Sequence, residues 1–302
     1  MVIKNFQQLI ERVSNFKDKK KVVVVAAHDD HALEAVFRAK EDNLVDPILI
    51  GDKGKIEEIL KKNGFTIGEE SIIHIPDDSE AAYKAVELIN EDKADFIMKG
   101  KIQTADLLKA VVDKEKGIRT GRLMTHFAFL EIPTYHKLVV ITDGGMVTYP
   151  DLEQKKGIVQ NAVDVLLSLG YEKPKVAALA AVEKVNPKMP EAVDGYELKK
   201  MAESGEIQNC IIEGPISYDI AMSRESAEIK GFDSPVVEDV DIFLVPNIAT
   251  GNILAKALIY SANAKMAGFI VGAKAPIILT SRGSSSEEKY LSIVLAAAVN
   301  MK

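Results

Sequence analysis

Short apolar runs alternate along the chain with stretches whose apolar residues recur every three or four positions. The runs are rich in Val and Ile and include KVVVVAA at 21–27, PILIG at 47–51 and DFIMKG at 95–100. The stretches between them, such as AHDDHALEAVFRAKED and KGKIEEILKKNG, have helical spacing with charged residues between the apolar ones. Strands that alternate with crossover helices predict the α/β class, with a mostly parallel sheet covered on both faces.

This alternation of strand-like and helical segments is interrupted once, between about residues 118 and 145. RLMTHFAFLEI and KLVVITDG are consecutive strand-like runs with no helix between them, which predicts an antiparallel pair. We therefore predict two doubly wound α/β lobes with a cleft between them. Residues 1–127 plus 285–302 are expected to form the first domain, and residues 128–284 the second.

The composition limits the classes of partner. The 302 residues are 47% hydrophobic and 27% charged, as in a soluble globular protein, and the formal charge of −7 argues against a nucleic-acid partner. The single cysteine, Cys210, excludes an internal disulfide. We find no signal-peptide pattern and no apolar run long enough to span a bilayer, so we expect a cytoplasmic protein without a membrane partner.

A basic segment follows the strand-like run that ends near residue 99. MKGKIQTADLLK, residues 98–109, places lysines and a glycine before a predicted helix, for which Thr104 is a candidate cap. Ammonium groups beside free helix N–H groups could bind phosphate, although lysines on a solvated turn are an equally good interpretation. The candidate residues are Lys99, Lys101, Thr104 and Lys109, with Arg119 in the next basic cluster.

Two polar loops follow strand-like runs in the second half of the chain. ITDGGMV leaves its strand through Asp143 and two glycines, and VPNIATGN contains Asn247, Gly251 and Asn252. Carboxyl ends of strands face the ligand crevice in α/β folds, so these residues are candidate substrate contacts. Each loop alone is also consistent with a simple connection between strand and helix.

AHDDH, residues 27–31, is the one cluster with metal-binding residue types. An Asp at the N-cap with acidic neighbours in the first turn explains the same pattern, because adjacent residues on a helix point in different directions. We therefore predict a helix cap that lines the crevice and no metal site. Its His28–His31 segment has no assigned role.

TSRGSSSEE, residues 280–288, joins an apolar strand-like run to an apolar helix. Serines 284–286 are candidate caps, and the helix dipole accounts for Glu287 and Glu288. Arg282 has no such structural reason. A guanidinium at a strand end is suited to bidentate recognition of phosphate.

These segments together resemble the phosphate acetyltransferase and phosphate butyryltransferase family. The resemblance rests first on TSRG, which has an acidic residue seven positions after its serine. It rests also on motifs that occur in the same order as in the family, span nearly the whole chain and are closest to the butyryltransferase branch. These motifs are MKG…TADLL, GIRTGRLMTH, NPKMP, EGPISYDIA, DIFLVPNIATGN and APIILTSR. It implies the isocitrate/isopropylmalate dehydrogenase-like architecture, and a homodimer or larger homo-oligomer. The implied reaction is reversible conversion of acyl-CoA and orthophosphate to acyl phosphate and CoA, as in fatty acid fermentation, with coenzyme A as substrate or product and no further cofactor.

The resemblance also implies roles for the residues at 281–288. Ser281 would orient the thiol, Arg282 would hold the phosphate, and Glu288 would be the general base. Glu287 stays open as the base, because acetyltransferases place an aspartate at position 288 and the two glutamates are adjacent. The acyl chain is expected to be butyryl or a branched analogue, with acetyl-CoA as an alternative substrate.

Two other classes remain. A metal- and NAD-dependent dehydrogenase of the same architecture would need convergent aspartates, and a non-catalytic sensor would bind CoA or acyl phosphate without turnover.

Overall fold

The computed structural model describes residues 2–281 and 283–299. By contacts the chain forms two compact units. Unit 1 contains the described residues up to Asn5 together with Leu123–Lys265, and unit 2 contains Phe6–Arg122 together with the described residues from Met266 onward. None of the helices in the described part of the chain combines the length and apolar character that crossing a membrane requires.

Unit 2 consists of helices that alternate with a mostly parallel run of strands. Its elements are α1 (Phe6–Ser14), β1 (Lys20–Val25), α2 (Asp30–Glu41), β2 (Val45–Gly51), α3 (Lys53–Asn63), the 3₁₀ turn η1 (Glu69–Ser71), β3 (Ile72–His74), α4 (Asp78–Asn90), β4 (Phe96–Lys99), α5 (Thr104–Val111), β10 (Lys265–Val271), β11 (Ile277–Ile278) and α11 (Ser286–Ala298). The strand order is β3-β2-β1-β4-β11-β10, and only the β10–β11 pair is antiparallel among the pairs described within this unit.

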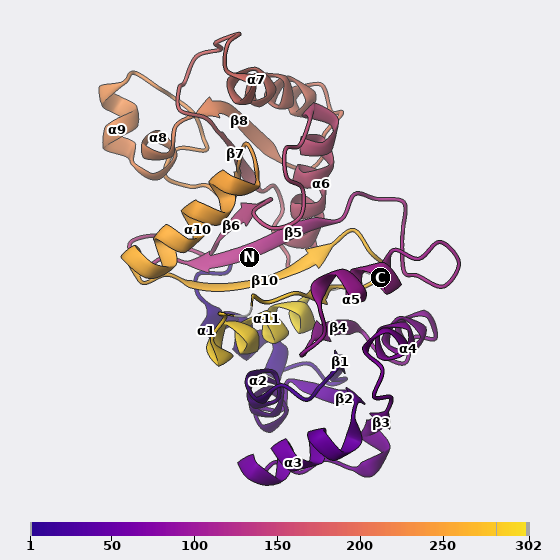
Figure 1. Cartoon of the computed structure of the whole chain (residues 1–302). Helices are drawn as coiled ribbons and strands as arrows, with labels where there is room; N and C mark the ends of the chain where they lie inside the picture. Colours follow the sequence, from indigo (N-terminus) through magenta and orange to yellow (C-terminus); the bar gives the residue numbers. More distant parts are fainter. Residues whose placement is uncertain (1, 282, 300–302) are drawn as a thin grey trace. The chain divides into compact units, whose positions relative to one another are not determined.

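The strand order of unit 2 reverses direction at β1. The chain moves outward from β1 to β2 and β3, and then returns to place β4 on the other side of β1. Right-handed crossovers therefore place α2 and α4 on opposite faces of the sheet. In agreement, α11 packs against α2 and α1, whereas α4 packs against α5 (Figure 1). This is the doubly wound arrangement predicted from the sequence.

Aspartate caps begin three of these helices directly after strands. Asp29, Asp52 and Asp77 each accept a hydrogen bond from a backbone N–H in the first turn, of α2, α3 and α4 respectively. Such caps satisfy donors that the helix itself leaves unpaired. The N-cap interpretation of the AHDDH segment is therefore confirmed, with Asp29 as the cap.

Unit 1 contains β5 (Thr125–Glu131), β6 (Val139–Thr142), α6 (Leu152–Ser168), β7 (Lys175–Leu179), α7 (Pro190–Glu203), β8 (Ile211–Ile216), α8 (Tyr218–Met222), α9 (Arg224–Ile229), β9 (Ile242–Leu244) and α10 (Ile248–Ala262). Its strand order is β5-β6-β9-β7-β8, in which β5–β6 is antiparallel and the other pairs are parallel. The predicted antiparallel pair near residues 122–144 is confirmed.

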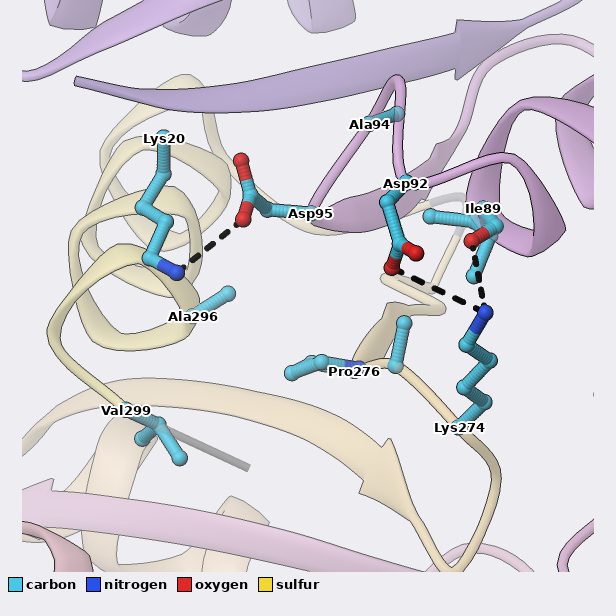
Figure 2. Close-up of a pocket in the computed structure, with 10 residues that line it drawn as sticks. Lys20, Ile89, Asp92, Ala94, Asp95, Lys274, Pro276, Ala296 and Val299 are labelled. Atoms are coloured by element: carbon cyan, nitrogen blue, oxygen red, sulfur yellow. Dashed lines mark hydrogen bonds and ion pairs between the residues drawn. The ribbon is translucent and has the colours of Figure 1, made fainter. Parts of the chain in front are cut away.

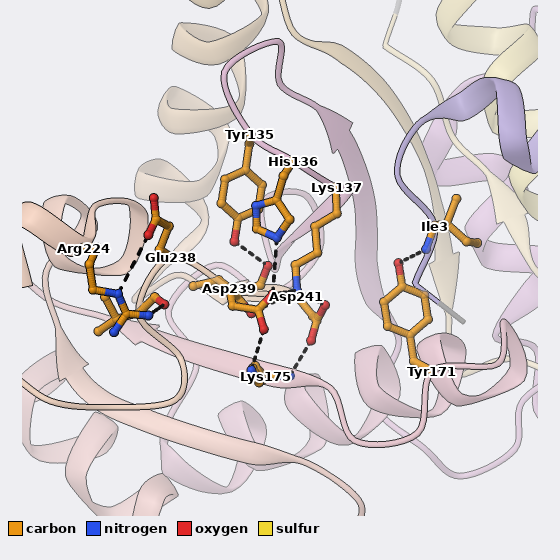
Figure 3. Close-up of polar contacts among 12 residues, drawn as sticks. Ile3, Tyr135, His136, Lys137, Tyr171, Lys175, Arg224, Glu238, Asp239 and Asp241 are labelled. Carbon is orange, nitrogen blue, oxygen red and sulfur yellow. Dashed lines mark hydrogen bonds and ion pairs between the residues drawn. The ribbon is translucent and has the colours of Figure 1, made fainter.

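A partly buried ionic network connects the starts of three strands in unit 1 (Figure 3). The ammonium of Lys137, before β6, donates to Asp239 at 2.6 Å and to Asp241 at 2.7 Å, and Asp241 accepts from the backbone N–H of Lys175. Burial alone would raise the pKa of Asp239, but hydrogen bonds from Lys137 and Lys175 lower it to about 2. The Asp239 carboxylate therefore stays ionised down to strongly acidic pH.

The observed units place the segment before the last helix differently from the predicted domains. Residues 266–284 were expected in the second domain, but by contacts those of them that the structure describes belong to unit 2 with α11. The reason is strand pairing, because Ile277 and Ile278 of β11 lie beside Ile97 and Met98 of β4.

Candidate active site

The carboxyl ends of three neighbouring strands meet in unit 2. β1 and β4 are parallel neighbours at the point where the strand order reverses, and β11 runs parallel to β4 on its other side. In open α/β sheets, ligands bind outside the carboxyl ends of strands at such a switch point. The topology alone therefore marks the loops after β1, β4 and β11 as the candidate site of this unit.

Gly100 lets the loops after β1 and β4 approach closely. Its N–H donates to the carbonyl of Val25 at 2.9 Å, and the N–H of Lys101 donates to the carbonyl of Ala26 at the same distance. A Cβ at position 100 would lie 2.4 Å from the Ala26 oxygen and 2.7 Å from the Val25 oxygen. Only glycine fits between these carbonyls without moving the backbone.

A cavity of about 360 Å³ opens at these three strand ends. The N-cap and first turn of α2 contribute Asp29 and His31, and the end of β4 with the loop after it contributes residues 99–103. The segment after β11 contributes Thr280 and Ser281. The predicted residues Lys99, Lys101 and Ser281 are therefore brought together at one cavity, although they come from segments far apart in the sequence.

The turn after β11 positions Ser281. The Ser281 hydroxyl oxygen accepts from the N–H of Gly283 at 3.2 Å, and its carbonyl accepts from the N–H of Ser284 at 3.1 Å. Ser285 then caps α11 by accepting from the N–H of Glu288. Arg282, the predicted phosphate ligand, lies outside the described residues.

The two candidate glutamates have different surroundings. Glu287 forms an ion pair with Arg38, whose guanidinium also lies 3.8 Å from the centre of the Tyr290 ring. Glu288 is more buried, and its Oε1 accepts from the Ser284 hydroxyl at 2.7 Å. Burial raises the pKa of Glu288, and the hydrogen bond from Ser284 opposes that rise. Neither glutamate is among the residues that line the cavity.

Lys289 is a lining residue that the sequence reasoning missed. It is only 7% exposed, and its ammonium donates to the Thr280 hydroxyl at 3.0 Å. Burial lowers its pKa. A signal was present in the sequence, because Lys289 is the only cation in the otherwise apolar helix that follows the two glutamates.

Among the described residues of unit 2, the predicted Thr104, Lys109 and Arg119 do not line this cavity. Lys109 and Arg119 are exposed, and Arg119 forms an isolated antiparallel bridge with Ala273. The capping role suggested for Thr104 is wrong, because α5 begins at Thr104 itself and its N-cap is Gln103, which makes no side-chain capping bond. Helix ends shift by a residue easily when no side chain fixes them.

The side chains of the AHDDH segment diverge. Asp29 accepts from the N–H of Ala32, Asp30 pairs with Lys62 at 2.8 Å, and His31 lies near Glu34. Across residues 2–281 and 283–299, no three His, Cys, Asp or Glu side chains are grouped so as to hold a metal ion. The Nδ1 atom of His28 is buried without a hydrogen-bond partner, and burial followed by the charge of Lys55 lowers the pKa of this residue.

In unit 1 the predicted residues lie in the loop after β6 and at the start of α10. The Asp143 carboxylate accepts from the backbone N–H groups of four residues, and Asn247 caps α10 by accepting from the N–H of Thr250. A Cβ at Gly251 would lie 2.8 Å from the Cα of Gly144, so the Asp143 loop packs tightly on the start of α10. Asn252 is exposed. The substrate contacts predicted for these residues stay predictions.

His126 lies beside this loop and was not singled out in the sequence. Its Nδ1 is buried with no hydrogen-bond partner, and burial lowers its pKa. A Cβ on Gly145 would lie 3.0 Å from the imidazole Cγ, so the glycine accommodates the ring. The histidine of the TH pair in GIRTGRLMTH was the available signal.

A second cavity in unit 2, of about 150 Å³, lies away from the strand ends that form the candidate site (Figure 2). Its lysines are already paired: Lys20 contacts Asp95 at 3.0 Å, and Lys274 contacts Asp92 and the carbonyl of Ile89. None of the predicted site residues within 2–281 and 283–299 lines it.

Comparison with known proteins places these features in context. The chain matches the family model described as "Phosphate acetyl/butaryl transferase" over residues 5–84 and 77–297. It is 45% identical over 298 residues to a phosphate butyryltransferase of Clostridium acetobutylicum, with 99% of each chain covered. It is also 42% identical over 278 residues to a phosphate acetyltransferase of Thermotoga maritima, with 92% of this chain and 94% of the relative covered. A crystal structure of a branched-chain phosphotransacylase from Enterococcus faecalis V583 superimposes with a TM-score of 0.81 at 32% identity, covering 92% of this chain and 98% of that one.

Proposed function

Because the chain belongs to the phosphate acetyl/butyryltransferase family, we propose that it converts a short-chain acyl-CoA and orthophosphate reversibly to acyl phosphate and CoA. The observation that carries this proposal is the cavity at the switch point of unit 2. Lys99, Lys101 and the Ser281 hydroxyl border it, which supplies cationic groups for a phosphate and a hydroxyl for a thiol. Butyryl-CoA or a branched analogue is the proposed substrate, and acetyl-CoA is the alternative, since relatives of similar identity carry both names.

The proposed reaction is direct transfer in a ternary complex. An oxygen of hydrogen phosphate attacks the thioester carbon, a C–O bond forms and the C–S bond breaks, and CoA leaves as a thiol. The proton lost by the phosphate is the proton gained by the sulfur, so a single carboxylate that accepts and returns it balances the step. We propose Glu288 for this role, with Ser281 orienting the sulfur and Arg282 holding the phosphate.

The surroundings of the two glutamates support Glu288 over Glu287 as the base. The Glu287 carboxylate is already engaged in an ion pair with the guanidinium of Arg38. Glu288 has no cationic partner within 4 Å in the described part of the chain, and burial raises its pKa towards neutrality. A base whose pKa lies nearer the working pH transfers protons more efficiently.

The test is a panel of acyl-CoA thioesters of increasing chain length, assayed by release of thiol when orthophosphate is added. We expect release from butyryl-CoA and branched analogues. Glu288→Gln should lower kcat by about 10²–10⁴-fold, the usual contribution of a general base, whereas Glu287→Gln, its matched control, should retain activity close to wild type. No release from acetyl-, propionyl-, butyryl- or isobutyryl-CoA by folded protein would refute the proposal.

We further propose that two copies of the chain associate through α10. This helix is apolar over most of its surface and has Lys256 as its single charge, yet only Gly251 on it is buried. Ile253 is 68% exposed and Tyr260 is 79% exposed. A helix that is apolar all round is normally covered, and an apolar helix face can cover its own copy across a two-fold axis. That no further cofactor is needed, and that the protein is cytoplasmic, stay predictions.

A further inference from the structure

Lys289 is an unusual lysine, because it is buried beside a cavity. It lies in the first half of α11, is 7% exposed and lines the cavity at the ends of β1, β4 and β11. Lysine is almost never this buried unless an opposite charge pairs with it. The position therefore requires an explanation.

No carboxylate in residues 2–281 or 283–299 comes within 4 Å of the Lys289 ammonium. The two nearby acids that act on it from a longer distance, Asp29 and Glu288, are engaged elsewhere. Asp29 accepts from the N–H of Ala32 at 2.7 Å, and Glu288 accepts from the Ser284 hydroxyl. The only hydrogen bond of the ammonium in this region goes to the Thr280 hydroxyl, so two of its three donors are available to a ligand.

The other walls of the cavity favour an anion as that ligand. Lys99 and Lys101 border it together with Lys289, and the Ser281 hydroxyl adds a neutral donor. Among the described residues on its wall, Asp29 alone carries a carboxylate, and its Oδ1 is occupied in capping α2. A cavity of about 360 Å³ accommodates a phosphoryl group with space for an attached acyl chain.

We propose that Lys289 is a substrate-binding residue that holds the transferred phosphoryl group, as orthophosphate in one direction and as acyl phosphate in the other. This inference rests on the proposed function and adds to it a phosphate ligand from α11, next to the proposed base. Thr280 positions the ammonium by accepting one of its hydrogen bonds. A bound dianion supplies the counter-charge that the protein lacks at this position.

The experiment compares Lys289→Met with wild type, using Lys274→Met as the matched control. Lys274 is also in unit 2 but contacts Asp92 and the carbonyls of Ile89 and Asn90, away from the cavity. For Lys289→Met we expect the KM for orthophosphate to rise about tenfold or more, the loss typical of a charge-assisted hydrogen bond, while the KM for acyl-CoA stays close to wild type. Lys274→Met should leave both KM values unchanged.

A binding measurement separates this inference from the proposed function. Orthophosphate should raise the Tm of wild type and of Lys274→Met above the value in chloride at matched ionic strength, and it should not raise that of Lys289→Met. If wild type releases no thiol from any acyl-CoA, the proposed function fails, while loss of this stabilisation in Lys289→Met would still support the phosphate site.

An unchanged KM for orthophosphate together with unchanged stabilisation in Lys289→Met overturns the inference. Lys289→Gln provides a second variant if the methionine protein does not fold, because glutamine can keep the contact with Thr280 without the charge. It should show the same increase in the KM for orthophosphate. A wild-type KM in folded Lys289→Gln would likewise overturn the proposal.

Discussion

Ser284 determines the electrostatic surroundings of the proposed base. Its hydroxyl donates to Glu288 Oε1 at 2.7 Å, and Ser284 is itself 7% exposed, so water cannot easily replace it. The backbone of Glu288 is held as well, because its N–H donates to the Ser285 hydroxyl and its carbonyl accepts from the Ser292 hydroxyl. The Ser292 hydroxyl oxygen in turn accepts from the N–H of Gly268. Serine hydroxyls therefore fix the position of this residue, and one of them contacts the carboxylate itself.

We expect Ser284→Ala to shift the pH dependence of activity. The hydrogen bond from Ser284 lowers the pKa of Glu288 against the effect of burial, so its removal raises that pKa further. Because a general base must be deprotonated, the acidic limb of the kcat profile should move to higher pH, with lower activity below the limb and near-normal activity above it. The measurement is kcat against pH for Ser284→Ala and for Ser286→Ala as control. Coincident acidic limbs would show that Ser284 does not act on the base.

At the scale of elements, the site depends on how closely two strand ends approach. Gly100→Ala would push a Cβ to within 2.4 Å of the carbonyl of Ala26, which is backbone and cannot rotate away. We expect a loss of about 1–3 kcal/mol in the free energy of unfolding, typical of overpacking, and reduced activity because Lys99 and Lys101 flank this residue.

Gly54→Ala is the matched control for that variant. Gly54 lies in α3, and an added Cβ there meets nothing closer than 3.5 Å. Alanine in a helix is favoured over glycine by about 0.5–1 kcal/mol, so this variant should be as stable as wild type or more stable. Urea unfolding of both variants checks the prediction, and equal stability of Gly100→Ala and wild type would contradict it.

Elements were predictable from the sequence where a local signal determines them. Val22–Val25 form a buried strand because their side chains are apolar on both faces, and Asp29 begins α2 because its carboxylate caps the helix. The stretch YDIAMSRESAEIKG has a helical pattern throughout, but it forms two helices, α8 and α9. Ser223 accepts from the N–H of Ser226 and starts a second helix where the pattern alone shows no break.

At the scale of the whole molecule, the candidate site could be predicted only in part. Lys99 was found because it ends a strand-like run, and Ser281 was found because TSRG resembles the family motif. Parallel strands bring residues at their carboxyl ends to the same edge of a sheet, and both residues line the cavity there. Lys289 was not found, because its importance comes from burial beside the cavity, and burial depends on how α11 packs against segments that are distant in the sequence. The orphan nitrogens of His28 and His126 are likewise visible only once their neighbours are in place.

The proposed association through α10 predicts that a charge on this helix separates the copies. Ile253→Glu places a carboxylate in the centre of the apolar surface, where it would have to be buried without a partner, so the variant should sediment as a monomer where wild type sediments as a dimer or larger assembly. Ile229→Glu is the matched control, because Ile229 on α9 is 79% exposed but lies on a different helix. It should leave the sedimentation coefficient unchanged.

A monomeric wild type, or an Ile253→Glu protein that assembles as wild type does, would exclude α10 as the contact. If the copies separate while thiol release continues at the wild-type rate, then each chain carries a complete site, as expected if unit 2 supplies its phosphate ligands from its own strand ends.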